Sequence, residues 1–145
     1  MAKQAKRRLL VREERRRRRR PAPSGSALLT IRIDQGGKRL LGPGKVRLME
    51  LIRELGSISA AGRAMGMSYR RAWLLVDALN ASFREPLVEK QTGGSGGGGA
   101  GLTRLGREVV ERYRRIERLA AGASRKDVQA LLASLADKPS LSRRL

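Results

Sequence analysis

The residues best suited to a chemical task form one short run, Ser68, Tyr69, Arg70 and Arg71, in a chain of 145 residues. An arginine guanidinium group can donate two hydrogen bonds to O6 and N7 of guanine in the major groove of DNA. Ser68 with the free amides of a helix N-terminus suits a phosphate group, and Tyr69 can stack on a sugar or touch a thymine methyl group. We therefore predict that these four residues contact DNA. The alternative is that Arg70 and Arg71 only solvate an exposed helix face.

A helix has to carry this run, and the surrounding sequence predicts one. Ser68 is a favourable N-cap, and the residues after it form an apolar stripe at helical spacing: Ala72, Leu75, Val76, Leu79 and Phe83. Residues 57–65 predict a shorter helix capped by Ser57 or Ser59, and Gly66 permits the turn between the two helices. Such a pair is a helix-turn-helix, in which the first turn of the second helix faces the bases.

A β-hairpin wing is predicted after this motif. Residues 87–92 have the composition of a strand, residues 93–101 are rich in glycine, and Leu102 begins a return strand. The residues expected to contact phosphates or the minor groove here are Lys90, Thr92, Ser95 and Arg104. The glycine run also matches the GxGxxG expression of dinucleotide-binding sites. Any glycine run matches it, however, and the chain has no room for repeated βαβ units.

The composition agrees with a nucleic-acid partner and excludes most catalytic machinery. The chain holds 33 Lys and Arg residues against 13 Asp and Glu, and this net charge of +20 attracts polyanions. Because Cys and His are absent, zinc fingers, thiolate nucleophiles and imidazole bases are excluded, so we expect no catalytic residues and no metal site. No run approaches the ~18 apolar residues of a membrane span, and residues 9–11 are too short for the core of a signal peptide. We expect a cytoplasmic protein without a membrane partner.

The segments before the motif complete the predicted fold. Residues 1–26 hold eleven basic residues and two glutamates and are predicted to be a disordered basic arm, either a non-specific DNA tether or an unselected tail. Residues 28–41 predict a short β-hairpin with its turn at 34–37, and residues 43–55 predict the first core helix. The fold class is therefore mainly α (α+β), a winged helix-turn-helix domain over residues 27–121 with an N-terminal β-hairpin.

A long C-terminal dimerisation helix is predicted over residues 103–121, with Thr103 as its N-cap. Its apolar residues repeat at alternating steps of three and four, which is typical of a helix that packs against a partner helix. The residues expected at this homodimer interface are Leu105, Val109, Tyr113, Ile116 and Leu119. Residues 122–145 are predicted to be a basic tail with room for one short helix.

Two stretches of the sequence resemble a known family. GSISAAGRAMGMSYRRAWLLVDALN at residues 56–80 and LVEKQTGGSGGGGAGLTRLGREVV at residues 87–110 are similar to the DNA-binding half of the molybdate-responsive ModE regulators. The resemblance covers roughly residues 27–120. LysR-type regulators, which share the winged motif and an LTxxG segment, are the nearest alternative, and a nucleoid-associated protein that binds DNA without specificity is another.

The ModE resemblance implies a transcription regulator that binds palindromic promoter sites as a dimer and controls genes of molybdate uptake and molybdoenzymes. In that family, C-terminal β-domains bind the molybdate. Only about 25 residues follow the last predicted helix, too few for such a domain, so we expect no molybdate cofactor in this chain. A separate molybdate-binding protein would then supply the signal. The operator sequence and the choice between repression and activation are not predicted.

Overall fold

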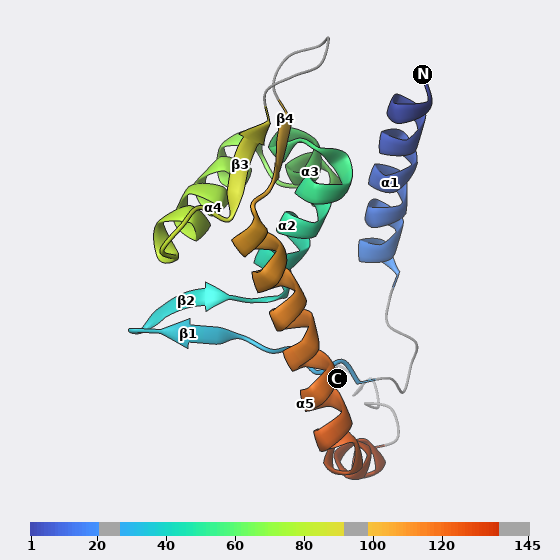
Figure 1. The fold of residues 1–145 in the computed structure, drawn as a ribbon. Helices are drawn as coiled ribbons and strands as arrows, with labels where there is room; N and C mark the ends of the chain where they lie inside the picture. Colours follow the sequence, from blue (N-terminus) through green and yellow to red (C-terminus); the bar gives the residue numbers. More distant parts are fainter. Residues whose placement is uncertain (21–26, 92–98, 137–145) are drawn as a thin grey trace, which may run out of the picture.

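The computed structural model describes residues 1–20, 27–91 and 99–136, and Figure 1 shows their arrangement. Within these residues the elements, in chain order, are α1 (Ala2–Arg19), β1 (Ile33–Gln35), β2 (Lys38–Leu41), α2 (Pro43–Leu55), α3 (Ile58–Ala64), α4 (Tyr69–Ser82), β3 (Val88–Gln91), β4 (Gly99–Leu102) and α5 (Arg104–Ala133). The two strand pairs are separate antiparallel hairpins. The predicted class, a mainly helical winged helix-turn-helix fold with an N-terminal hairpin, is confirmed.

Helix α2 lies at the centre of the core. Pro43 occupies its first turn, where a missing N–H costs nothing, and Gly56 ends it in the left-handed region with φ +65. Its apolar residues are almost inaccessible to solvent because α3, β4 and α5 all pack against it. The fully buried side chains of α2 are Val46, Leu48, Met49, Leu51 and Ile52. A helix that is apolar on most sides is typical of a buried position.

The first hairpin is shorter than predicted. Strand β1 begins at Ile33, whereas strand structure was expected from residue 28. Its partner β2 has only four residues and is followed at once by Gly42 and α2, so the chain before Ile33 has no strand to pair with. That segment contacts α5 instead, where the Tyr113 hydroxyl donates a hydrogen bond of 2.7 Å to the carbonyl oxygen of Ile31.

The prediction of disorder for residues 1–26 is wrong over residues 2–19, which form helix α1 beside α3 (Figure 1). Leu10 and Val11 pack against the core, and Arg7 Nε donates a hydrogen bond of 2.8 Å to the carbonyl oxygen of Leu55. Glu14 is buried at 5% exposure and forms an ion pair of 2.6 Å with Arg47 of α2. The high net charge of the segment led to the prediction of disorder, although the residues that contact the rest of the protein recur at helical spacing: Arg7, Leu10, Val11 and Glu14.

Helix α5 runs to Ala133, past the expected end at residue 121, so the short helix predicted in the tail is its last part. The physical reason is local composition: no proline interrupts the segment, and Gly122 lies among good helix formers such as Ala120 and Ala121. No helix in the described part of the chain is long and apolar enough to cross a membrane.

The predicted dimerisation stripe is divided by the fold. Val109 and Tyr113 are buried at 8% and 1% exposure in the chain's own core, so their assignment to a dimer interface is wrong. Leu105 packs partly against the same core. Ile116 and Leu119, by contrast, are 41% and 62% exposed. The first half of the stripe packs against α2 and strand β4 of the second hairpin, and this packing accounts for its helical spacing. Only the second half remains open to solvent.

Candidate nucleic-acid interface

The helix-turn-helix is formed by α3, a short turn and α4. Ser57 caps α3, with its Oγ accepting a hydrogen bond of 3.1 Å from the Ala60 amide. The helices approach closely at Gly62, where an added Cβ would lie 2.7 Å from the Cβ of Ala72. Gly66 in the turn has φ +69, a conformation that residues with a side chain rarely adopt. These small residues fix the angle at which α4 leaves α3.

One face of α4 is buried and the other is open to a ligand. Ala72, Val76 and Leu79 point into the core, as the apolar stripe predicted. Tyr69 and Leu74 are 65% and 57% exposed. The open face also carries the exposed side chains of Arg70 and Asp77. The first turn of α4 therefore presents the side chains that a recognition helix would place against base edges.

Ser68 serves as the N-cap of this helix. Its Oγ accepts a hydrogen bond of 3.2 Å from the Arg71 amide, and the residue is exposed. Capping satisfies one of the amides that the first turn leaves without a partner. The hydroxyl proton is not used in this contact, so Ser68 can both cap α4 and donate to a phosphate oxygen.

Arg71 points away from the side of α4 that carries Trp73. It lines a hollow between the first hairpin, the start of α2 and α4, together with Arg32, Arg39 and Lys45. The Lys45 ammonium group is held by the carbonyl oxygens of Arg39 and Leu40, at 2.8 and 3.1 Å. The four predicted contact residues therefore do not form a single surface patch. Tyr69 and Arg70 share the open face, and Arg71 belongs to a separate basic cluster.

The wing lies on the other side of α4. Strands β3 and β4 pair from Val88 opposite Leu102 to Gln91 opposite Gly99. The Ala100 amide donates to the carbonyl oxygen of Gly56 at 3.0 Å, which ties the wing to the turn between α2 and α3.

The predicted wing residues fall in different places. Lys90 is exposed, with Nζ 5.8 Å from the centroid of the Trp73 ring. The side chain of Arg104, the first residue of α5, is 89% exposed and pairs with Glu108 at 3.2 Å. The other two predicted wing residues, Thr92 and Ser95, lie outside the described residues. Lys90 and Arg104 are therefore accessible to a phosphate group.

Two residues of the interface were missed by sequence reasoning. The Asn80 Oδ1 accepts hydrogen bonds from the amides of Leu87 and Val88 at 2.8 and 3.0 Å, and its Nδ2 donates to the Val88 carbonyl oxygen at 3.0 Å. Asn80 therefore fixes the wing to α4. A signal was present, because Asn80 is a polar residue four positions after Val76, on the packed side of α4.

Trp73 is the second missed residue. Its ring centroid lies 6.0 Å from that of Tyr69, and Lys90 approaches the ring from the wing. Its Nε1 atom is buried and has no hydrogen-bond partner within the described residues. Together with Ser57, Ser59 and Lys90, Trp73 lines a hollow between α3, α4 and the wing. Tryptophan is more often a packing residue, so its type alone gave no reason to include it.

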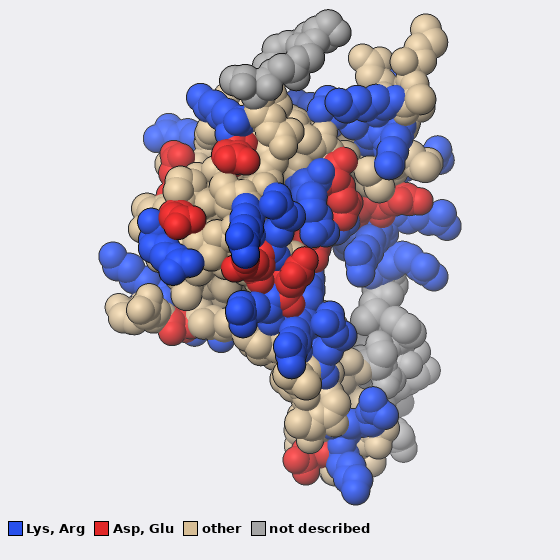
Figure 2. Space-filling model, viewed as in Figure 1, with Lys and Arg blue, Asp and Glu red and all other residues tan. Residues whose placement is uncertain are grey.

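A network of charged side chains joins α1, α2 and α5 beside this interface. Arg47 binds Glu14 at 2.6 Å and Glu50 at 3.2 Å, while Arg114 of α5 binds Glu50 at 2.7 Å and Glu117 at 2.6 Å. Burial opposes the charged form of Glu50, but hydrogen bonds from Arg114 and then Arg47 prevail and hold the pKa of Glu50 below its ordinary value. Figure 2 shows acidic side chains near the middle of the face that it draws, with basic side chains around them.

The comparison with protein families matches residues 44–117, from α2 through the wing into α5, to the bacterial regulatory helix-turn-helix proteins of the LysR family. The chain belongs to this family. The matched residues contain both helices of the helix-turn-helix, the wing and the buried part of α5, so the family contributes the whole framework that carries the exposed face of α4.

Curated relatives are similar over the same part of the chain. The "Transcriptional regulator ModE" of Yersinia pestis is 40% identical over 86 residues, which are 59% of this chain and 32% of the relative. The "Molybdenum transport protein ModE" of Azotobacter vinelandii is 42% identical over 73 residues, 50% of this chain and 27% of the relative. The "Molybdenum-pterin-binding protein MopA" of Rhodobacter capsulatus is 34% identical over 90 residues, 62% of this chain and 34% of the relative.

These matches confirm the resemblance to the ModE regulators over the part of the chain that carries the helix-turn-helix and the wing. The LysR-type alternative concerns the same residues, so the two interpretations differ in the name of the group and not in the DNA-binding element. The chain spans about a third of the length of these curated relatives. Within residues 1–20, 27–91 and 99–136, no cluster of three His, Cys, Asp or Glu residues could hold a metal ion.

Proposed function

We propose that this protein is a homodimeric transcription regulator that binds specific palindromic sites in promoters of molybdate-uptake or molybdoenzyme genes, in the cytoplasm. The observation that carries the proposal is the open first turn of α4, with Tyr69 and Arg70 exposed beside Trp73, in a chain 40% identical to a ModE regulator over 86 residues. Regulation of molybdenum genes is suggested by the names of the relatives alone.

The residues divide into base-reading and phosphate-binding groups in this proposal. Arg70 and Tyr69 read bases, because they share the exposed face of the first turn of α4. Arg71 binds a phosphate together with Arg39, because both line the hollow at the start of α2. Lys90 binds the backbone on the wing side. Base contacts determine the sequence, whereas phosphate contacts set register and affinity.

The dimer is proposed from the part of α5 that follows Tyr113. Ile116 and Leu119 are exposed there, and Leu131 is 70% exposed. Burying such large apolar side chains away from water lowers the free energy. A second copy of α5 would cover them. Two-fold symmetry would then place two α4 helices about one helical turn of DNA apart, which requires a palindromic site.

We further propose that this chain binds its site without molybdate and receives the molybdate signal from a separate molybdate-binding protein. The residues that match the family are those of the helix-turn-helix, the wing and α5, which carry the proposed contacts with DNA. Isothermal titration of the protein with molybdate should give no heat. A binding signal in this titration would contradict the proposal.

Genome-wide mapping of bound sites in cells grown with and without molybdate tests the function directly. We expect a small set of palindromic sites upstream of molybdenum genes. Uniform occupancy of the chromosome would instead support a nucleoid-associated protein.

Variants at neighbouring arginines test the division of roles. Arg70→Ala should weaken the preferred site by roughly 1–3 kcal/mol and relax preference at one base, whereas Arg71→Ala should weaken all sequences alike and lower the salt slope by about 1. Equal losses on preferred and random DNA for both variants would refute base reading by α4.

Variants of α5 test the dimer. Sedimentation velocity of Ile116→Glu and Leu119→Glu should show monomers, and an unchanged dimer would exclude α5 as the interface.

A further inference from the structure

Helix α1 has two distinct faces. The face toward the body carries Arg7, Leu10, Val11 and Glu14, which recur at the three- and four-residue steps of one helical stripe. The remaining side chains are exposed, and most of them are lysines and arginines. The similarity to the LysR family begins at residue 44, so α1 lies outside the matched framework. A helix added to that framework and then docked on it calls for a functional explanation.

The docking fixes α1 in one rotation about its axis. Glu14 is 5% exposed, and its Oε2 accepts hydrogen bonds from both Nε and Nη2 of Arg47, at 3.1 and 2.6 Å. Charge-assisted hydrogen bonds of this kind are short and strong, and together with the contacts of Arg7, Leu10 and Val11 they hold the helix in place. Arg7, one helical turn before Val11, donates a hydrogen bond to the carbonyl oxygen of Leu55 at the C-terminal end of α2. Each remaining arginine of α1 therefore points in a defined direction.

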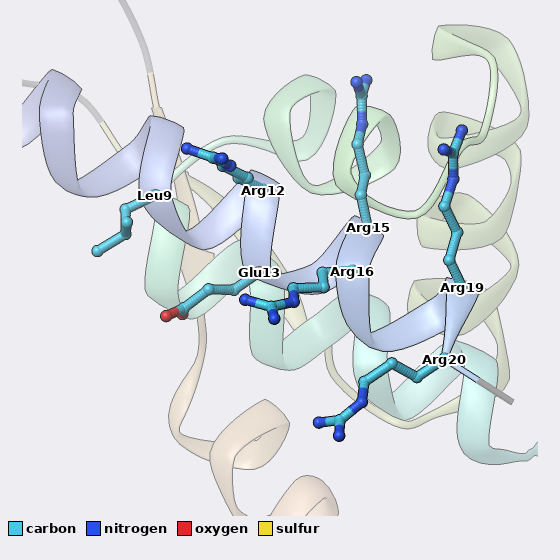
Figure 3. A pocket seen from close by; sticks show the side chains of 7 residues that line it. All are labelled: Leu9, Arg12, Glu13, Arg15, Arg16, Arg19 and Arg20. Carbon is cyan, nitrogen blue, oxygen red and sulfur yellow. The ribbon is translucent and has the colours of Figure 1, made fainter. Parts of the chain in front are cut away.

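One row of arginines is thereby placed beside the helix-turn-helix. Arg8, Arg12 and Arg15 line a groove shared with Arg63 of α3. Arg19 lies one turn after Arg15 and lines a second, open hollow together with Arg12, Arg15, Arg16 and Arg20. Figure 3 shows Arg15 and Arg19 extending to one side of α1, while Glu13, Arg16 and Arg20 extend to the other. The two rows differ in what lies next to them. The first borders α3, and the second includes an acidic residue.

The row along α3 is not neutralised by the protein. Among the described residues, no Asp or Glu forms an ion pair with any of its arginines. Like charges three and four residues apart repel one another on a helix, so this row destabilises α1 unless an anion is bound. From residue 8 to residue 19 the row extends about 16 Å at 1.5 Å per residue, or roughly five base-pair steps of duplex DNA.

We propose that α1 binds the phosphate backbone of the duplex immediately beyond the site that α4 reads. The proposal rests on the proposed function, in which α4 occupies the major groove. In a helix-turn-helix the first helix crosses the DNA backbone, and here that helix is α3. Because α1 packs against α3, duplex that continues past α3 runs along the row of arginines. The contact adds affinity and about five base pairs of footprint without reading sequence.

A matched pair of double variants tests the direction of the row. Arg15→Gln/Arg19→Gln and Arg16→Gln/Arg20→Gln remove the same charge from neighbouring positions, and the two pairs of side chains extend in different directions (Figure 3). Binding of each protein to a fluorescein-labelled mixed-sequence 40-bp duplex is measured by anisotropy from 50 to 200 mM salt. We expect the first variant to lower the slope of log affinity against log salt by about 1.8, for two lost phosphate contacts, and the second by less than about 0.5. Equal slopes for both variants would overturn the proposal, because the contribution of α1 would then depend only on its charge and not on which row of arginines faces the duplex.

The length of the duplex supplies the second test. On the site recovered by selection from randomised DNA, wild-type protein should lose about tenfold in affinity when the flanks are trimmed by five base pairs on each side. The Arg15→Gln/Arg19→Gln variant keeps Arg8 and Arg12 and should lose only about threefold, half of the wild-type effect on a logarithmic scale, and equal losses by both proteins would refute the contact with the flanks. If selection recovers no preferred site, the proposed function fails, while the salt slopes on mixed-sequence DNA still decide the role of α1. Circular dichroism of both variants confirms that α1 remains folded.

Discussion

Replacing Asn80 with alanine should detach the wing from the recognition helix. The Asn80 amide makes three hydrogen bonds with the backbone of Leu87 and Val88, at 2.8 to 3.0 Å. Leu87 is fully buried and Val88 is 4% exposed, so water can replace few of these bonds in the variant. Alanine keeps the helix and removes only the amide.

The expected loss of stability follows from these three bonds. Each contributes about 1 kcal/mol net, and a buried amide left without a partner costs roughly 1–3 kcal/mol. We therefore expect Asn80→Ala to lower the free energy of unfolding by about 3 kcal/mol. Since a whole domain is stable by only about 5–15 kcal/mol, the midpoint of thermal unfolding should fall by on the order of 10 °C.

Thermal and urea unfolding followed by circular dichroism measure this effect, with Ser82→Ala as the control at an exposed position two residues later on α4. The Ser82 hydroxyl bonds only the carbonyl oxygen of Ala78 within the same helix, so the control should change stability by less than about 0.5 kcal/mol. Asn80→Asp keeps the acceptor for both amides and loses only the donor to Val88, so it should be intermediate. A stability of Asn80→Ala within about 0.5 kcal/mol of wild type would refute the assignment of Asn80 as the link between α4 and the wing.

Three further predictions concern the turn, the helix contact and the charged network. Gly66→Ala should cost about 1–2 kcal/mol by urea unfolding, because φ is +69 while the space around the residue is open; no loss would contradict the strain argument. Gly62→Ala should cost about 1–3 kcal/mol and weaken DNA binding, since its Cβ would lie 2.7 Å from that of Ala72; wild-type affinity would contradict a fixed α3–α4 angle. The folded-state pKa of Glu50 lies below its unfolded value, so its stabilisation is complete above the ordinary carboxyl pKa of about 4.3 and is lost as pH falls through the lower folded pKa. Acid unfolding of Glu50→Gln should therefore depend less on pH below about 4, and an unchanged profile would exclude this contribution.

The helix-turn-helix could be predicted from sequence because local signals determine it. Ser57 and Ser68 are caps in the structure, Gly66 has the positive φ that its type suggested, and the apolar stripe of α4 is buried. Each of these features depends on neighbours within a few residues. Sequence reasoning is most reliable for such features, since propensity, capping and packing all favour the same structure.

Long-range contacts explain what could not be predicted. The order of α1 depends on Glu14 meeting Arg47, 33 residues away, and no local rule pairs these two residues. Likewise, the Tyr113 hydroxyl binds Ile31, 82 residues earlier, which makes Tyr113 a core residue. A helical apolar stripe has the same spacing whether it packs on its own domain or on a partner, so periodicity alone does not distinguish the two cases.

The distribution of acidic residues connects the fold to the proposed contacts with DNA. Glu14, Glu50 and Glu117 are used within one network that holds α1, α2 and α5 together. They therefore neutralise arginines that have a structural role, Arg47 and Arg114, and not those beside α3 or around Arg71. Because buried pairs are screened by salt much less than exposed charges, the network should persist at ionic strengths that release phosphate contacts. The net charge of +20 thus includes arginines that fix the framework, such as Arg47 and Arg114, and arginines that we propose contact the duplex.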